Sequence, residues 1–180
     1  ENDHSKYDSQ SEKQILKETA RKAGEVVRQR GDIKQALNSA HKTVEATYYA
    51  PLLAQAPMEP PAAAARVDGD SAEVWTSTQN PQAAQALIAE ILKIPVENVT
   101  IHVTLLGGGF GRKSKPDFAA EAAWLAQKAG RPVKVVWRRE DDIQHGFYHT
   151  VSAQHIRAAL DENGNAIAWH HNTVFPTISS

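Results

Sequence analysis

A glycine-rich segment, Gly107–Gly111, limits how this chain can fold, because four of its five residues are glycine. Before it, residues 99–105 alternate between apolar and polar side chains, which predicts a β-strand. After it, residues 116–130 are rich in alanine and apolar around much of a helical wheel, which predicts a largely buried helix. Glycines at such a junction let the backbone bend and come close to another group. The sequence therefore predicts a strand, a closely approaching loop and a helix.

The remaining pattern predicts further helices and strands around this unit. Helices are expected at residues 12–30, 33–40 and 81–93, and strands at residues 42–51, 64–67, 72–78, 133–137, 151–160 and 166–175. Asp32 and Asn80 are placed to cap the second and third helices, Ser114 is expected to cap the helix after the loop, and Gly130 to end it. Residues 138–143 are expected to form a charged turn. This order favours an α+β fold with helices packed on a mixed β-sheet.

The glycine loop nearly matches two nucleotide-binding motifs, and both matches fail at the same residue. A phosphate loop, G-x-x-x-x-G-K-[ST], would start at Gly107 and place Lys113 and Ser114 correctly, but it needs glycine where the chain has Arg112. The dinucleotide pattern G-x-G-x-x-G also needs its third glycine at this position. From the residues alone two interpretations stay open: backbone N–H groups that bind an anion or an oxo group, or a tight turn in which Phe110 plugs the core.

The totals exclude several classes of function. The chain carries 20 basic and 21 acidic side chains, a net charge of −1, which gives no electrostatic case for a nucleic-acid partner. It has no cysteine, so it contains no disulfide, iron–sulfur ligand or thiol nucleophile. No apolar run approaches the ~20 residues of a membrane helix, and the totals fix no cellular compartment. His145 and His149 have the spacing of a metal pair only on a helix, which Gly146 argues against.

Four stretches carry a family resemblance. They are "GGGFGRK" in the loop, "WTSTQNPQ" at residues 75–82, "TVEATYYAPLLAQAPMEPPAAAARV" upstream of it and "GRPVKVVWRREDDI" downstream of the loop. In order and approximate spacing, from about Gly31 to Val174, they resemble the molybdenum hydroxylases, the xanthine dehydrogenase and aldehyde oxidase family. The variant "GGGFGR", together with "YYAPLLAQAPMEPP", is most similar to isoquinoline 1-oxidoreductase beta subunits and related membrane-linked aldehyde dehydrogenases.

The resemblance implies a role for the glycine loop. In this family the molybdenum is held by the dithiolene of its pterin, so the protein supplies no metal ligand and instead positions the cofactor. Gln79 would hydrogen-bond an oxygen ligand of the metal through its neutral amide donor. Gly108, Gly109 and Gly111 would let the backbone approach the metal centre, and Phe110 would wall the substrate pocket.

Three positions depart from the family's patterns. Arg112, in place of glycine, would lie just beyond the closest approach to the metal and would face a pterin phosphate, the substrate or solvent. Gln55 stands where relatives often have histidine before the "MEP" turn. Ser114 stands where xanthine-type members place a substrate-binding glutamate, so purine oxidation is not expected.

The resemblance also implies partners and a cofactor. The substrate would be an aldehyde or an N-heteroaromatic compound, hydroxylated with oxygen derived from water. The cofactor would be molybdopterin in its cytosine dinucleotide form, and electrons would pass to a [2Fe–2S] small subunit or domain. A membrane cytochrome subunit is a further partner to be considered, and no nucleic acid is expected. The family's general base is a glutamate near the far end of the subunit, so no catalytic residue is assigned in this chain, and the chain alone is expected to be inactive.

The chain is accordingly expected to be part of a longer subunit. Residues 13–180 would be the N-terminal portion of its molybdopterin-binding domain, and residues 1–12 would be disordered or added by cloning. Two alternatives stay open: an anion- or nucleotide-binding module that uses Gly107–Ser114, and a structural α+β domain without a site.

Overall fold

The computed structural model describes residues 7–176, which form two compact units. One unit combines the parts of the chain before Ala54 and after His149, and the other is the continuous stretch from Ala54 to His149. Of the segment expected to be disordered or added by cloning, residues 1–6 lie outside the described residues, whereas residues 9–12 belong to the first helix. The assignment of residues 13–180 to the first portion of a longer domain stays a prediction.

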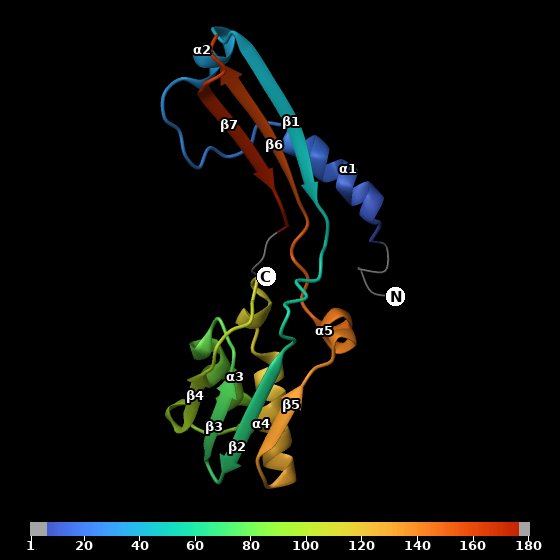
Figure 1. The fold of residues 1–180 in the computed structure, drawn as a ribbon, viewed down its shortest axis with the longest axis vertical. Coiled ribbons are helices and arrows are strands. Elements are labelled where there is room, and N and C mark those ends of the chain that lie inside the picture. The colour runs from blue at the N-terminus through green and yellow to red at the C-terminus, as the bar shows by residue number, and fades with distance from the viewer. Residues whose placement is uncertain (1–6, 177–180) are drawn as a thin grey trace. The chain divides into compact units, whose positions relative to one another are not determined.

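The first unit is a three-stranded antiparallel sheet with two helices (Figure 1). Its elements are α1 Ser9–Ala20, α2 Ile33–Asn38, β1 Lys42–Ala50, β6 Ser152–Leu160 and β7 Ala166–Val174. Strand β6 is central, because β1 pairs with it on one side and β7 returns beside it as a hairpin on the other. Leu16 and Ala20 of α1 are buried in one cluster with Val151 and Ala153, so this helix is held by its apolar face.

The first helix is displaced from the predicted residues 12–30. It begins earlier because the carboxylate of Asp8 caps it, accepting a hydrogen bond from the backbone N–H of Ser11 at 2.9 Å. It ends at Ala20, the last residue of its buried face, and Val26 and Val27 beyond it are largely exposed. Apolar residues at helical spacing do not extend a helix where they find no other apolar surface to pack against, because most helical stability in proteins comes from such packing.

The second unit is a four-stranded sheet with helices, and it contains every residue of the predicted site. Its elements are β2 Ala62–Asp68, β3 Ser71–Thr76, α3 Pro81–Leu92, η2 Val96–Asn98, β4 Val99–Val103, η3 Arg112–Ser114, α4 Asp117–Ala129, β5 Val133–Val136 and α5 Arg139–His145. The strand order is β4-β3-β2-β5, with β3 and β4 parallel and the other pairs antiparallel. Helices α3 and α4 pack on this sheet (Figure 1), and Val74, Ile88 and Phe118 are fully buried between them.

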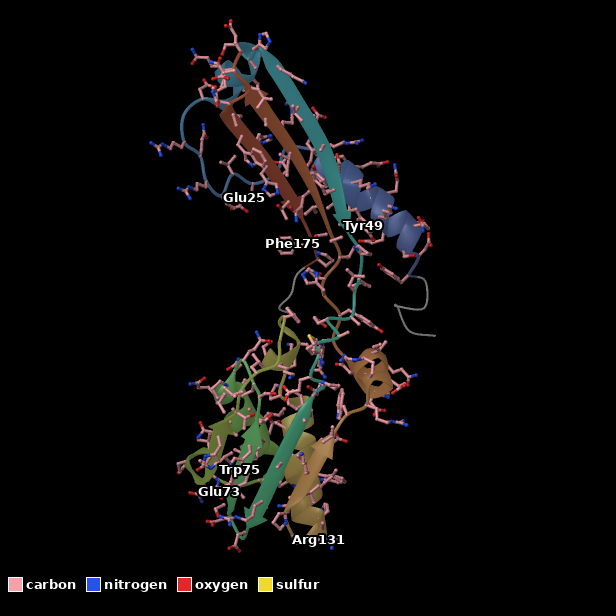
Figure 2. The ribbon with its side chains drawn as sticks, viewed as in Figure 1. Glu25, Tyr49, Glu73, Trp75, Arg131 and Phe175 are labelled. Atoms are coloured by element: carbon pink, nitrogen blue, oxygen red, sulfur yellow. The ribbon has the colours of Figure 1, made fainter. Side chains whose placement is uncertain are left out.

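Strand β3 shows how the two faces of this sheet differ. Ala72 and Val74 are buried on the helix-covered face. Glu73 and Trp75 alternate with them and lie on the opposite face (Figure 2). The Trp75 ring is partly exposed and stacks on His102 of β4, with ring centroids 4.9 Å apart. The helix-covered face therefore supplies the core.

The predicted α+β class is confirmed, with one refinement of the sheet and two corrections. The four-stranded sheet is mixed, as expected, but the other three strands form a separate antiparallel sheet. Residues 139–145 form α5 where a charged turn was predicted. The Asp141 carboxylate accepts a hydrogen bond from the backbone N–H of Arg138 at 2.9 Å, which caps the first turn and holds the pKa of Asp141 below its usual value. Ser114 does not cap α4, whose N-cap is Pro116.

Candidate functional site

The site lies where the parallel strands β3 and β4 end side by side. Thr76 pairs with Val103, and the carboxyl ends of parallel strands meet at one edge of a sheet. Residues 77–79 leave β3 at this edge and the glycine loop follows β4. Gln79 N and Thr78 Oγ1 both donate to the carbonyl oxygen of Lys113 at 3.0 Å. The parallel pairing thus joins the "STQNP" segment to the loop.

Gln79 packs directly on the glycines of the loop. Its Oε1 accepts a hydrogen bond from the backbone N–H of Gly111 at 3.0 Å. A Cβ added at Gly109 would lie 2.4 Å from the same oxygen, so only glycine lets the Gln79 side chain lie there. Oε1 accepts this bond, and the amide nitrogen Nε2 is the side chain's donor, from which no group among residues 7–176 accepts a hydrogen bond. The arrangement leaves a neutral donor beside an approachable backbone.

Phe110 lies on the outside of the loop, and its side chain is 68 % exposed. Its φ of 51° is in the left-handed region, which costs a non-glycine residue about 1–2 kcal/mol. A Cβ at Gly108 would lie 2.9 Å from Phe110 Cε2, so that glycine leaves room for the ring. The interpretation of Phe110 as a core plug is therefore wrong, and its exposed ring can line a pocket.

The side chain of Arg112 points into the protein and is only 1 % exposed. Its two terminal nitrogens donate to the two carboxylate oxygens of Asp117, each at 2.9 Å. This bidentate pair is the strongest common form of a charged hydrogen bond. The solvent-facing alternative for Arg112 is therefore wrong, because its guanidinium is held by α4. A contact between Arg112 and a cofactor stays a prediction.

Lys113 is fully buried and paired with a carboxylate from a distant part of the chain. Its Nζ donates to Oε2 of Glu59 at 2.6 Å and to the hydroxyl of Ser77 at 3.2 Å. Glu59 also accepts from the backbone N–H of Gly107 at 3.4 Å, at the start of the loop. The Lys113 ammonium holds the pKa of Glu59 below its usual value, and the hydrogen bonds from Ser77 and Gly107 act in the same direction. This pair fastens the loop at both of its ends.

Sequence reasoning missed the residues that hold the two basic side chains. Glu59 lies in the irregular "MEPP" segment, and Asp117 falls within the helix predicted for residues 116–130, so neither pattern signals an ion pair. The sequence offered one weak signal, two adjacent basic residues after the glycines with Asp117 close behind them. In the structure both Arg112 and Lys113 turn inward.

The described residues hold no side-chain metal centre. Among residues 7–176, no group of three or more histidine, cysteine, aspartate or glutamate side chains could hold a metal ion. His145 ends α5 and Gly146 has an extended backbone, so His145 and His149 do not share a helix, as predicted. Within the same range no helix is both long and apolar enough to span a bilayer.

The edge of the parallel pair thus carries a loop with few side chains, an exposed glutamine and an exposed aromatic ring. These features define an α+β protein with an accessible stretch of backbone at one edge of its mixed sheet. Residues 16–177 match the family model of the molybdopterin cofactor-binding domain, and the chain belongs to that family.

Curated relatives agree with this membership. The chain is 40 % identical over 124 residues to the isoquinoline 1-oxidoreductase subunit beta of Brevundimonas diminuta, a match that covers 68 % of this chain and 16 % of the relative. It is 37 % identical over 145 residues to the aldehyde oxidoreductase molybdenum-binding subunit PaoC of Escherichia coli K12, covering 79 % of this chain and 20 % of that subunit. The chain therefore spans about a fifth or less of the length of these relatives.

Solved structures share the fold. The aldehyde oxidoreductase of Desulfovibrio gigas matches with a TM-score of 0.64 and 22 % identity, over 81 % of this chain and 16 % of that one. Quinoline 2-oxidoreductase of Pseudomonas putida 86 matches with a TM-score of 0.62 and 23 % identity, over 80 % of this chain and 19 % of that one.

The residues at the loop fit a cofactor whose metal is held by its own organic ligand. Such a group needs no cysteine, which the chain lacks, and no histidine cluster, which residues 7–176 lack. It needs donors and room, and the structure offers the Gln79 amide beside glycines where a Cβ would collide.

Proposed function

We propose that this chain is the part of a molybdenum hydroxylase subunit that presents Gln79 and the glycine loop to the molybdenum cofactor. The observation that carries the proposal is the Gln79 side chain, whose Oε1 lies against Gly109 and accepts from Gly111, while its amide nitrogen has no acceptor among residues 7–176. Family membership gives the class of cofactor, and this contact gives a reason for glycine at position 109.

Each residue of the loop has a distinct part in this proposal. Gln79 Nε2 would donate a hydrogen bond to an oxygen ligand of the metal, and Gly108, Gly109 and Gly111 would let the backbone approach it. Phe110 would wall the substrate pocket and keep water from that side. The bound cofactor supplies the redox chemistry, in which the substrate is oxidised and its carbon gains an oxygen derived from water.

The substrate class follows from the relatives. Their names cite isoquinoline and aldehyde oxidation, so we infer an N-heteroaromatic compound or an aldehyde as the substrate. The cofactor would be the cytosine dinucleotide form of molybdopterin, and electrons would pass to a [2Fe–2S] small subunit or domain, with a membrane cytochrome subunit as a further partner. The general base would be a glutamate elsewhere in the subunit, so this chain alone should be inactive.

The position of Lys113 argues against the nucleotide-binding alternative. A phosphate loop needs its lysine directed at the phosphates. Lys113 is instead 0 % exposed and engaged with Glu59 and Ser77. The Lys113 ammonium, which the phosphate-loop motif would use, is therefore already engaged inside the protein.

The proposal is tested on the full-length subunit with its partners. Metal analysis of the purified enzyme should find molybdenum, and Gln79→Ala should lower turnover by about 10- to 100-fold, the usual effect of removing a group that supports a metal centre. Its melting temperature should match that of Gln127→Ala, a control that removes only a long 3.5 Å hydrogen bond to Leu92 in the same unit. Absence of molybdenum from the wild-type enzyme, or full turnover in Gln79→Ala, would contradict the proposal.

A further inference from the structure

The guanidinium of Arg112 is enclosed by side chains from three separate stretches of the chain. We call this set the Arg112 cage, and its members are Asp117 and Phe118 of α4, Trp137 after β5, Asp142 of α5 and Phe147 after α5. The guanidinium carbon lies 5.3 Å from the ring centre of Trp137, 5.4 Å from that of Phe147 and 5.9 Å from that of Phe118. Three aromatic faces and a bidentate carboxylate suit arginine and no other side chain.

Charge inside the cage is balanced. Asp117 pairs with Arg112, and the buried Asp142 pairs with Arg139 at 2.5 Å while lying 4.0 Å from Nε of Arg112. Two positive and two negative groups are therefore held together, with Arg112 and Asp142 buried and Asp117 and Arg139 about one third exposed. A buried charge of this kind needs its partner held close by. Gly146 closes the cage, since a Cβ there would lie 2.3 Å from the carbonyl oxygen of Asp142 and 3.4 Å from Arg112 Nε.

The backbone of the same residue closes the turn that displays Phe110. The N–H of Arg112 donates to the carbonyl oxygen of Gly109 at 2.9 Å. Between these two residues, Phe110 and Gly111 have φ values of 51° and 89°. A left-handed phenylalanine persists only where its surroundings fix both ends of the turn. Gln79 fixes the turn from the β3 side, and the buried Arg112 side chain fixes its exit.

We propose that Arg112 is a positioning residue, whose caged guanidinium tethers the glycine loop to α4 and α5 and so sets the orientation of Phe110 and the Gln79 amide. The inference rests on the proposed function, because the loop is what the cofactor would meet. It explains why an arginine stands at the position where two nucleotide motifs need glycine. The side chain that breaks those motifs is turned away from the loop's open side and serves as its anchor.

The test compares Arg112→Lys with Arg138→Gln in the full-length enzyme. Lysine keeps the charge but can form neither the bidentate pair nor the planar stacking. Arg138 has a largely exposed side chain in the same unit, and among the described residues it forms an ion pair with Asp141 of the helix that it precedes, so its replacement is a matched control. Amide hydrogen exchange, read by mass spectrometry, should be about tenfold faster over residues 105–114 in Arg112→Lys than in the control, because a charge-assisted anchor is weakened. Exchange over residues 120–126 in α4 should be unchanged.

Steady-state kinetics supply the second measurement. In Arg112→Lys we expect kcat to fall about tenfold, with KM changed less and with molybdenum content equal to that of the wild type. If Arg112→Lys does not accumulate as folded protein, Asp117→Asn gives the same comparison, since it keeps the guanidinium and the shape of its partner. Unchanged loop exchange in the folded variant overturns the inference. Wild-type enzyme without molybdenum would instead defeat the proposed function, while the exchange comparison would still decide whether Arg112 anchors the loop.

Discussion

The ion pair between Lys113 and Glu59 gives a quantitative prediction for the substitution Glu59→Gln. The wild-type pair joins a fully buried ammonium to a carboxylate at 2.6 Å, with Ser77 as the only other hydrogen-bond partner of Nζ among the described residues. Glutamine is nearly the same shape but removes the negative charge. The variant therefore leaves a buried positive charge without a counter-ion.

The magnitude follows from burial. Removing one partner of a fully buried ion pair costs about 3–5 kcal/mol. The Glu59 side chain is 44 % exposed, so water reaches it, and the glutamine oxygen can still accept a hydrogen bond. We therefore expect a loss of about 2 kcal/mol in the free energy of unfolding, or about 4–8 °C in Tm for a protein of this size.

Thermal and urea unfolding followed by circular dichroism measure this loss. The control is Glu97→Gln, which neutralises an exposed glutamate in the same unit and should shift Tm by less than about 1 °C. The double variant Lys113→Met/Glu59→Gln should recover most of the stability, because no charge is then buried. Equal melting temperatures for Glu59→Gln and Glu97→Gln would refute the reasoning, as would a double variant less stable than Glu59→Gln.

Three further predictions concern pH, the loop and a helix cap. The pKa of Glu59 in the folded protein lies below its ordinary 4.5, so the ionised Glu59 carboxylate stabilises the fold above pH 4.5. This stabilisation is lost as the pH falls through the folded-state pKa. When Tm is measured at decreasing pH, it should therefore decline less in Glu59→Gln than in the wild type. Gly109→Ala places a Cβ 2.4 Å from Gln79 Oε1, so turnover of the full-length enzyme should fall about tenfold or more, against no change in Gly24→Ala, where the Cβ meets nothing. Asn80→Ala removes the hydrogen bond to Ala83 N that caps α3 and should cost about 1 kcal/mol in urea unfolding.

Local signals in the sequence predicted much of the fold. Asn80 caps α3 with Pro81 at its first position, Asp32 caps α2, and Gly130 ends α4 in a left-handed conformation, all as expected. Each of these helix caps and ends depends on a few neighbouring residues, so the local sequence is enough to predict it. The family resemblance was based on the order and spacing of short motifs, and the match to the family model confirms it.

What the sequence left open depends on groups that are distant in the chain. The inward direction of Lys113 is set by Glu59, and that of Arg112 by rings and carboxylates of α4 and α5. The end of α1 at Ala20 is set by where its core contact stops. Periodicity gives the face that a helix would bury, but only the tertiary structure decides how much of it finds a partner.

The sheet of the first unit has a consequence for synthesis of the chain. Among residues 7–176, strand β1 pairs with β6 alone, and Lys42 lies opposite Leu160. The whole of the second unit is therefore translated between the two partners. Units generally fold as they are completed. Residues 54–149 can therefore fold on the ribosome while β1 still has both edges unpaired. An unpaired strand of this kind is open to wrong pairing with other chains. Slow translation between residues 150 and 160 should therefore promote aggregation of nascent chains, whereas a pause before residue 42 should not.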